Sequence, residues 1–243
     1  MKLGIDMGGM SIKMGLVNEE NKIIGRITIP TDLTVPYQTL VERMADAVRQ
    51  MLENAGMTLE QCGGIGIGSP GTIDAKQGVI LYSNNFGWEN VPIVEELKKH
   101  LDTRIEIAND ADAAALGEVC AGAAEGAENA VLLTLGTGVG SGVILDKKIF
   151  RGAMPGGCEL GHLSIRYDGI RCTCGRKGCL EAYASASALL RIAREKAAEH
   201  PESIMNEMCG NDLEQMNGKI PFDAAKAGDE AGMETVKEYE GYL

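Results

Sequence analysis

Short apolar segments separated by glycines and polar residues open the chain. They lie at residues 3–5, 12–17 and 23–29. Runs of β-branched and apolar side chains bounded by turn residues predict strands. From residue 37 to 55 the apolar positions instead recur at the spacing of one helix face, and Gly56 follows as a C-cap residue. The pattern therefore predicts three strands followed by an amphipathic helix.

The middle of the chain continues to alternate between strand and helix patterns. The predicted elements are a buried strand at residues 64–68, a turn and strand at 72–83, a helix at 91–101, a strand at 104–108 and an alanine-rich helix from Asp110 to about Ala121. A second hairpin follows, with strands at 131–135 and 141–145 around a glycine turn at 136–140. Because its layout repeats that of the first hairpin, the sequence predicts a duplicated α/β architecture.

The rest of the chain carries a loop and two helical patterns. A glycine- and cysteine-rich loop covers residues 151–179, a helix is predicted for 180–199, and a final helix begins near Asp223. Its apolar positions keep a helical period up to Leu243, and its last acidic residues have the wrong sign for a helix C-terminus. We therefore expect the chain to end within an element.

Composition and charge narrow the class of protein. The 243 residues are 44% hydrophobic and 24% charged, which is typical of a globular chain. A net charge of −12 argues against nucleic acid and anionic membranes as partners, since both are bound through Lys and Arg. No apolar segment has the length of a signal-peptide core or of a membrane span. The expected location is the cytoplasm, where thiols stay reduced.

Two glycine turns follow strands and are candidate phosphate sites. Backbone N–H groups bind phosphate oxygens where the absence of side chains lets the backbone approach closely. Each turn carries a hydroxyl, Ser11 in the first and Thr137 in the second, and Asp6 lies where it could hold a hydrated Mg²⁺. Residues 66–71 match the dinucleotide pattern G-x-G-x-x-G, but Pro70 and a further turn follow where a helix would be needed. The Walker pattern is absent.

Three cysteines and a histidine form a candidate metal site. Cys172, Cys174 and Cys179 share one glycine-rich loop, and His162 precedes it by ten residues. This ligand set in a reduced compartment is typical of structural zinc, and the alternative is a loop of free thiols. With four protein ligands, such a site would be closed and would not activate water.

Asp110 lies between a predicted strand and a predicted helix. It is either a helix N-cap or a general base at the carboxyl end of a strand, where open α/β sheets bind their ligands. Asn109 beside it could bind a hydroxyl group. Glu159 and Glu181 flank the cysteine loop as further polar candidates, although Glu181 also fits as an ordinary residue of a first helical turn.

Together these segments resemble the ROK family (repressor, open reading frame, kinase), and most closely its glucokinase branch. The segments that carry the resemblance are residues 4–13, 68–71, 84–88, 108–118, 133–140, 159–162 and 172–181. Each is short, but their order and spacing cover essentially the whole chain.

The resemblance implies an α/β fold of the actin-like (ribonuclease H-like) ATPase class, with two lobes around a cleft and a duplicated βββαβα-type core. The N-terminal lobe would comprise residues 1–115, with the first phosphate turn and the sugar-contacting loops. The C-terminal lobe would comprise residues 116–243, with the second phosphate turn and the zinc loop. Family members continue beyond Leu243, so this second lobe is expected to be incomplete. The resemblance also implies a cytoplasmic homodimer.

The implied activity is phosphorylation of a hexose, glucose first, at its 6-hydroxyl by ATP with Mg²⁺. Asp110 would take the proton of that hydroxyl. The implied substrate-binding residues are Gly71, Asn85, Asn109, Asp110, Glu159, His162 and Glu181. The implied ATP-binding residues are Asp6, Gly8, Gly9, Met10, Ser11, Lys13, Gly136, Thr137, Gly138 and Gly140. The implied ligands of structural Zn²⁺ are His162, Cys172, Cys174 and Cys179, with His162 serving the metal and the sugar through different ring nitrogens.

Two positions depart from the family pattern, and several alternatives stay open. Met10 stands where the family usually has Thr, and Asp112 replaces a common Asn. N-acetylmannosamine, N-acetylglucosamine and fructose are alternatives to glucose, and polyphosphate is an alternative to ATP. A sugar-responsive repressor would need a helix-turn-helix segment before the strand that contains Leu3. A non-catalytic fragment also fits, because the family's adenosine-side segment lies beyond Leu243.

Overall fold

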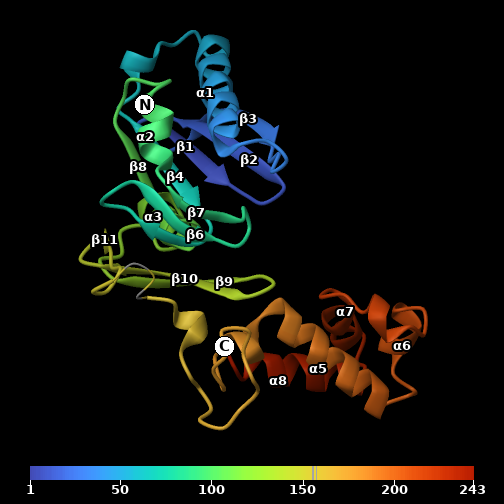
Figure 1. Ribbon diagram of the computed structural model, residues 1–243. Helices are drawn as coiled ribbons and strands as arrows, with labels where there is room; N and C mark the ends of the chain where they lie inside the picture. Colours follow the sequence, from blue (N-terminus) through green and yellow to red (C-terminus); the bar gives the residue numbers. More distant parts are fainter. Residues whose placement is uncertain (155, 157) are drawn as a thin grey trace. The chain divides into compact units, whose positions relative to one another are not determined.

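The computed structural model describes residues 1–154, 156 and 158–243 (Figure 1). By their contacts these residues form two compact units. Unit 1 comprises Met1–Leu132 and Gly142–Cys158, and unit 2 comprises Leu133–Ser141 and Glu159–Leu243. This grouping by contacts differs from the lobe boundary expected between residues 115 and 116, which stays a prediction about how the family's lobes map onto the chain. Each unit is described by itself.

A five-stranded sheet in the order β3-β2-β1-β4-β8 forms the centre of unit 1. Its strands are β1 (Lys2–Met7), β2 (Ser11–Val17), β3 (Ile23–Pro30), β4 (Ile65–Ser69) and β8 (Ile105–Asn109). β1, β2 and β3 pair antiparallel, whereas β4 lies parallel between β1 and β8. The predicted strands are therefore confirmed, with boundaries that differ by one or two residues.

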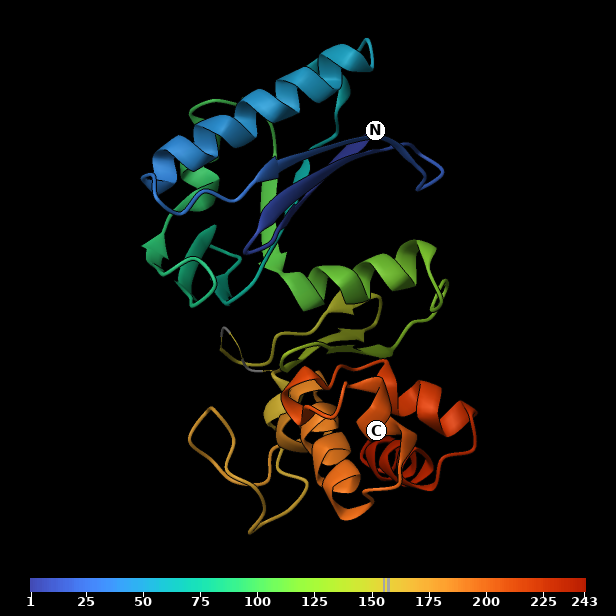
Figure 2. The same ribbon diagram turned by 90° about the vertical axis from the view of Figure 1, so that its right-hand side faces the viewer.

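Helix α1 (Tyr37–Asn54) packs on one face of this sheet (Figure 2). Its buried side chains recur every three or four residues, and they meet the alternating buried side chains of β1, namely Leu3, Ile5 and Met7. The helical spacing in α1 and the alternation in β1 each place one apolar face of the element toward a common core. The core also takes in residues of α2 (Ile93–Lys98) and of a small sheet made of β5 (Thr72–Asp74), β6 (Val79–Ser83) and β7 (Trp88–Val91).

Helix α3 (Asp110–Ala121) begins directly at the end of β8 and packs on the second hairpin. That hairpin consists of β9 (Ala130–Leu135) and β10 (Val139–Leu145), and β11 (Lys148–Ile149) extends it. Ala115, Val119 and Ile144 form a small core between the helix and the strands. A Cβ at Gly142 would overlap the carbonyl oxygen of Ala111, so glycine is required there for the close approach.

Unit 2 is built mainly from helices. They are η2 (Leu160–His162), α4 (Glu181–Ala184), α5 (Ala186–Glu199), α6 (Ile204–Met208), η3 (Leu213–Gln215), α7 (Ile220–Lys226) and α8 (Glu230–Glu240). The 3-10 helix η1 (Leu59–Gln61) belongs to unit 1 instead. Small and flexible apolar side chains, among them Ala193, Met205 and Ala224, fill the main core of unit 2. The buried Tyr239 of α8 donates its hydroxyl to the carbonyl oxygen of Ala184 at 2.8 Å. None of the helices in the described ranges is both long and apolar enough to cross a membrane.

Two of the predicted helices are wrong as single elements. The helix expected over residues 180–199 is divided at Ser185, whose backbone is extended and whose hydroxyl accepts the N–H of Ala188 as the N-cap of α5. The helix expected from Asp223 onward is also divided. Gly228 adopts a positive φ of 86° after α7, and Asp229 caps α8. In both cases a capping residue interrupts an apolar pattern that continues in the same period.

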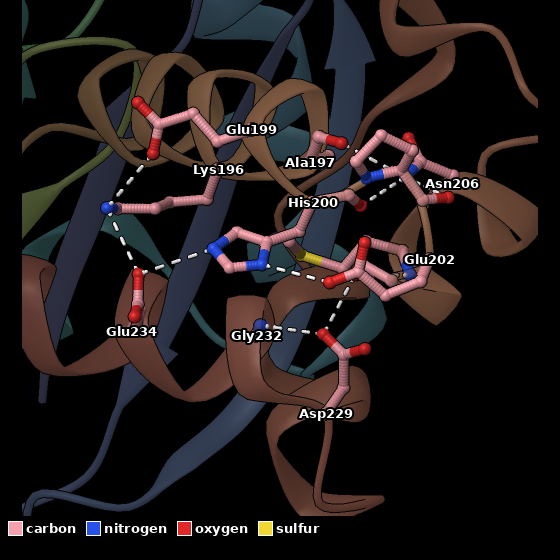
Figure 3. A network of polar contacts seen from close by, with 12 residues as sticks. Lys196, Ala197, Glu199, His200, Glu202, Asn206, Asp229, Gly232 and Glu234 are labelled. Carbon is pink, nitrogen blue, oxygen red and sulfur yellow. Dashed lines mark hydrogen bonds and ion pairs between the residues drawn. The ribbon is translucent and has the colours of Figure 1, made fainter.

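Asp229 holds two segments of unit 2 together (Figure 3). Its carboxylate accepts the N–H of Gly232 at 2.8 Å, the hydroxyl of Ser203 at 2.8 Å and the N–H of Ile204 at 3.0 Å. Burial by itself would raise the pKa of Asp229, but these donors outweigh it and the pKa lies below its ordinary value. One carboxylate therefore caps α8 and fixes the start of α6.

Replacing Asp229 by alanine is expected to lower the free energy of unfolding at pH 7 by about 1–3 kcal/mol, since a cap and two further hydrogen bonds are lost. Because the folded pKa is depressed, this contribution is complete above the unfolded value of 3.8 and disappears as the pH falls through the lower folded value. Urea unfolding at pH 7 and at pH 3 measures both effects. Glu230→Gln, an exposed neighbour, is the control, and an equal loss there would contradict the assignment.

Candidate functional site

The carboxyl ends of three parallel strands gather the candidate residues of unit 1. The register pairs Asp6 of β1 with Gly68 of β4, and Gly68 with Ala108 of β8. Adjacent strands lie about 4.8 Å apart, so the segments that follow these strands start side by side. The first glycine turn, the loop at Gly71 and the start of α3 therefore meet at one edge of the sheet.

The first glycine turn is held by its own backbone and by Thr31. The N–H of Gly8 donates to the carbonyl oxygen of Ser11 at 3.0 Å, and a Cβ on Gly8 would stand 2.8 Å from that oxygen. The hydroxyl of Thr31 donates to the carbonyl oxygen of Gly8. Met10 is 90% exposed at the tip of the turn. Lys13, the cross-strand partner of Asp6, lies 3.8 Å from its carboxylate, with both side chains mostly in solvent.

Asn109, and not Asp110, is the N-cap of α3. The Asn109 side-chain oxygen accepts the N–H groups of Ala111 at 2.9 Å and of Asp112 at 3.4 Å. Its amide nitrogen donates to the carbonyl oxygen of Gly71 at 3.1 Å. Gly71 has a φ of 111°, and a Cβ there would overlap the carbonyl oxygen of Tyr82, so no other residue fits. Asn109 thus ties the loop after β4 to the start of α3.

The Asp110 carboxyl is left available by this arrangement. Asp110 is exposed, and its carboxylate accepts the N–H of Ala111 at 2.9 Å. Burial among the neighbouring strand ends raises its pKa, and the negative charge of Asp6 adds to the rise, while hydrogen bonds from the start of α3 oppose it. A carboxyl with a raised pKa at the carboxyl end of a strand has the properties of a proton acceptor.

Asp112, the second acidic residue of this segment, is buried and pairs with Arg151. It is only 7% exposed and lies 3.4 Å from the guanidinium of Arg151. Burial raises the pKa of Asp112, and Arg151 opposes the rise. The negative charge of Asp112 is therefore paired within unit 1.

Asn85 lies beside the first glycine turn. A Cβ built on Gly9 would stand 3.8 Å from the Asn85 amide nitrogen. The turn that carries Asn85 is anchored by Phe86, which is buried and stacks on Trp88 with ring centroids 4.8 Å apart. A buried aromatic pair therefore fixes the position of this exposed amide.

The second glycine turn belongs to unit 2 and is closed by a hydrogen bond from the N–H of Gly136 to the carbonyl oxygen of Gly138. Its carbonyl groups accept from the residues that open α5. The N–H of Ala186 donates to Gly136 at 2.8 Å, and the hydroxyl of Ser187 donates to Thr137 at 3.0 Å. After the turn, Gly140 continues into β10.

His162, Cys172, Cys174 and Cys179 come together as the sequence predicts. Their donor atoms all lie within 4.8 Å of one another. The Cys172 sulfur is 3.7 Å from Nδ1 of His162, and the Cys174 and Cys179 sulfurs are 3.6 Å apart. In a tetrahedral zinc site with bonds of about 2.3 Å to sulfur and 2.0–2.1 Å to nitrogen, neighbouring ligand atoms are separated by about 3.5–3.8 Å. The four residues therefore fit such an ion.

Backbone and arginine contacts shape the loop around these ligands. The N–H of Cys172 donates to the carbonyl oxygen of Arg176 at 2.8 Å, and the Arg176 guanidinium donates to the carbonyl oxygen of His162 at 3.0 Å. Gly178 has a φ of 76°, and a Cβ there would overlap the carbonyl oxygen of Arg166. The N–H and guanidinium of Arg176 lower the pKa of Cys174 to about 6, whereas burial raises the pKa of Cys179 to about 11.

Glu159 and Glu181 occupy different positions in unit 2. Glu159 precedes η2, and its carbonyl oxygen accepts the N–H of His162 at 3.0 Å. The Glu181 carboxylate accepts the N–H of Val139 through Oε2 at 3.1 Å and the hydroxyl of Thr173 through Oε1 at 3.0 Å. It therefore touches both the second glycine turn and the cysteine loop.

Comparison with known proteins assigns the family. The family model described as "ROK family" matches residues 2–243. The chain belongs to the ROK family. It is 38% identical to a glucokinase of Thermotoga maritima over 228 residues, which cover 93% of this chain and 70% of that protein.

Solved structures of this family share the fold. One is a ROK family glucokinase from Streptomyces griseus in complex with glucose and AMPPNP, which is 31% identical in sequence and superposes with a TM-score of 0.76. The match covers 99% of this chain and 76% of that one. Another is a ROK hexokinase from Thermus thermophilus, which is 32% identical in sequence with a TM-score of 0.80. Here the match covers 99% of this chain and 74% of that one. The predicted α/β, actin-like ATPase fold is thereby confirmed.

Several residues that shape the site escaped the sequence analysis. Arg151 neutralises Asp112, Thr173 and Arg176 hold the cysteine loop, and Ser187 holds the second glycine turn. Their partners lie between 8 and 50 positions away along the chain. The Ser-Ala-Ser run at 185–187 is a cap pattern and could have indicated a helix start.

Proposed function

We propose that this chain transfers the γ-phosphoryl group of ATP to the 6-hydroxyl of a hexose, with glucose as the first candidate. The observation that carries the proposal is Asp110. Its carboxyl stands at the end of β8, keeps access to solvent, has a raised pKa and is relieved of the capping role by Asn109. Membership of a family with glucokinases, one of them solved with glucose and AMPPNP, supplies the reaction class.

In the proposed reaction Asp110 accepts the proton of the 6-hydroxyl. The hydroxyl oxygen attacks the γ-phosphorus, the bond from that phosphorus to the β–γ bridging oxygen breaks, and ADP leaves. Such transfers depend mainly on positioning and on neutralisation of charge. Asp6 is the proposed partner of hydrated Mg²⁺, and Lys13 beside it would add positive charge near the phosphates.

The two glycine turns are the proposed phosphate sites. In unit 1 the proposal comprises Gly8, Gly9, Met10 and Ser11, and in unit 2 it comprises Gly136, Thr137, Gly138 and Gly140. The Ser11 hydroxyl takes the part that Thr plays in the family at the position of Met10, whose own side chain is in solvent. Backbone N–H groups would supply most of the hydrogen bonds.

The residues proposed to contact the sugar are those that the family resemblance implies. Gly71, Asn85 and Asn109 belong to unit 1, and Glu159, His162 and Glu181 belong to unit 2. Asn109 uses its oxygen for the cap and one N–H for Gly71, which leaves its second N–H for a sugar hydroxyl. His162 presents Nδ1 to the cysteine cluster, so Nε2 is its proposed contact with the sugar.

Zinc is the proposed occupant of the cysteine cluster. Three thiolates and one imidazole suit this ion, and four protein ligands make the site closed and structural. His162, Cys172, Cys174 and Cys179 would hold it. Its contribution would be to order the loop, since metal-binding free energy is folding free energy where the site does not exist in the unfolded chain.

The remaining expectations stay predictions. They are a homodimer in the cytoplasm, no nucleic acid or membrane as partner, and glucose rather than N-acetylmannosamine, N-acetylglucosamine or fructose. Polyphosphate in place of ATP, and a chain that binds sugar without catalysis, are outcomes that the assay below distinguishes.

Purified chain kept reduced throughout is expected to carry about one zinc ion, because the four ligands fit a closed tetrahedral site. Elemental analysis of the protein measures the content. Cys172→Ser should lower it well below that value, whereas Cys120→Ser, at an exposed cysteine outside the cluster, should leave it unchanged. Zinc-free wild-type protein would contradict the proposal.

A coupled assay of ADP release over a panel of hexoses tests the proposed function. We expect turnover with glucose and ATP, and lower kcat/KM with N-acetylmannosamine, N-acetylglucosamine and fructose. Polyphosphate as the alternative donor is followed by formation of the sugar phosphate. Sugar binding by calorimetry without any turnover would identify a non-catalytic chain instead.

Asp110→Asn is expected to lower kcat by about 10²–10⁴-fold, since Asn keeps the size but cannot accept the proton. Glucose affinity should change little. Because the folded pKa of Asp110 is raised, ionisation disfavours the folded state as the pH rises through that value, so the variant should unfold at an equal or higher temperature. A variant that keeps more than about a tenth of the turnover would contradict the base role of Asp110.

A further inference from the structure

The segment that follows the last cysteine ligand contacts the second glycine turn at three points. It begins with Leu180 and Glu181, directly after Cys179. Glu181 accepts the N–H of Val139, while Ala186 and Ser187 donate to the carbonyl oxygens of Gly136 and Thr137. All of these residues belong to unit 2. The backbone of the turn is therefore held by residues of the segment that directly follows the cysteine loop.

Glu181 is the one residue of this segment that contacts both structures through its side chain. Oε2 lies 3.1 Å from the nitrogen of Val139, and Oε1 lies 3.0 Å from the hydroxyl of Thr173 and 3.4 Å from the sulfur of Cys172. A Cβ on Gly138 would overlap Oε2. The absence of a side chain at Gly138 thus gives the carboxylate its place against the turn.

An ordinary role in the first turn of a helix does not account for this geometry. Helix α4 has only four residues, and the Glu181 carboxylate receives hydrogen bonds from Val139 and Thr173, which both lie outside that helix. A metal-bound Cys172 would be a thiolate and could no longer donate, but the Thr173 hydroxyl and the Val139 N–H remain donors. The bridge therefore does not depend on the thiol proton.

We propose that Glu181, besides its proposed contact with the sugar, positions the second glycine turn by coupling it to the cysteine loop, so that order in the loop sets the affinity of the turn for nucleotide phosphates. The part concerning phosphates rests on the proposed function. The mechanical part, a hydrogen-bonded link from Thr173 through Glu181 to Val139, stands on these contacts alone.

The link is tested first without catalysis, by hydrogen exchange of the Val139 amide followed by NMR. Glu181→Ala should speed exchange about tenfold or more, because the amide loses its acceptor. Glu181→Gln, which keeps an acceptor oxygen, should have a smaller effect. Thr173→Val removes only the hydroxyl that orients the carboxylate and should give a clear, intermediate increase. Glu195→Gln, an exposed glutamate paired with Arg191 on α5, is the control and should change nothing.

The same variants are then titrated with AMPPNP and with glucose by calorimetry. Thr173→Val should weaken AMPPNP binding severalfold, whereas the Glu195→Gln control should leave it unchanged. Because Glu181 is also a proposed sugar contact, glucose affinity should fall in Thr173→Val as well. Unchanged Val139 exchange in both Glu181→Ala and Thr173→Val overturns the link. Faster exchange with unchanged AMPPNP affinity overturns its role in phosphate binding. Absence of glucose phosphorylation in the wild-type chain counts against the proposed function instead, and leaves the exchange result to decide the link.

Discussion

Parallel pairing of β1, β4 and β8 is the constraint on which the chemistry of unit 1 depends. The register that pairs Asp6 with Gly68, and Gly68 with Ala108, places three chain segments at one edge of the sheet. The pKa of Asp110 follows from that crowding, because burial and the charge of Asp6 both raise it. Asn109 then converts the strand end into a helix start and binds Gly71 across the edge. A slip of one residue would turn these side chains to the other face.

In unit 2 the cysteine loop and the second glycine turn are held in place with less apolar burial than the strand ends of unit 1. Large side chains of its loop, among them Leu163, Tyr167 and Ile170, are exposed, whereas Cys172 and Cys179 are 5% and 0% exposed. The order of this loop comes from hydrogen bonds and, under the proposed zinc binding, from the ion that its ligands would share. Residues 181–187 in turn hold the second glycine turn through hydrogen bonds. The two turns therefore differ in physical support even though their sequences look alike.

Local pattern predicted the strands, the first helix and the cysteine cluster because each depends on neighbours within one element or one loop. The pattern failed where a cap interrupts a continuing period, as at Ser185 and Asp229, since apolar spacing is the same on both sides of the break. Pairings across the fold were also out of reach. Asp112 with Arg151, and Glu181 with Val139, 42 positions apart, are set by tertiary packing alone.

The glycines of the two turns are weaker evidence for phosphate binding than the sequence alone suggests. The chain has 32 glycines, and the sequence predicts phosphate sites at the two turns that are rich in them. Gly8 is required by its contact with the Ser11 carbonyl and Gly71 by its positive φ, whereas a Cβ at Gly138 would meet only the end of the flexible Glu181 side chain. Packing thus accounts for Gly8 and Gly71 before any ligand is considered. Phosphate binding at the turns is therefore supported by their place after strands and by membership of the ROK family, and their glycine content adds little support.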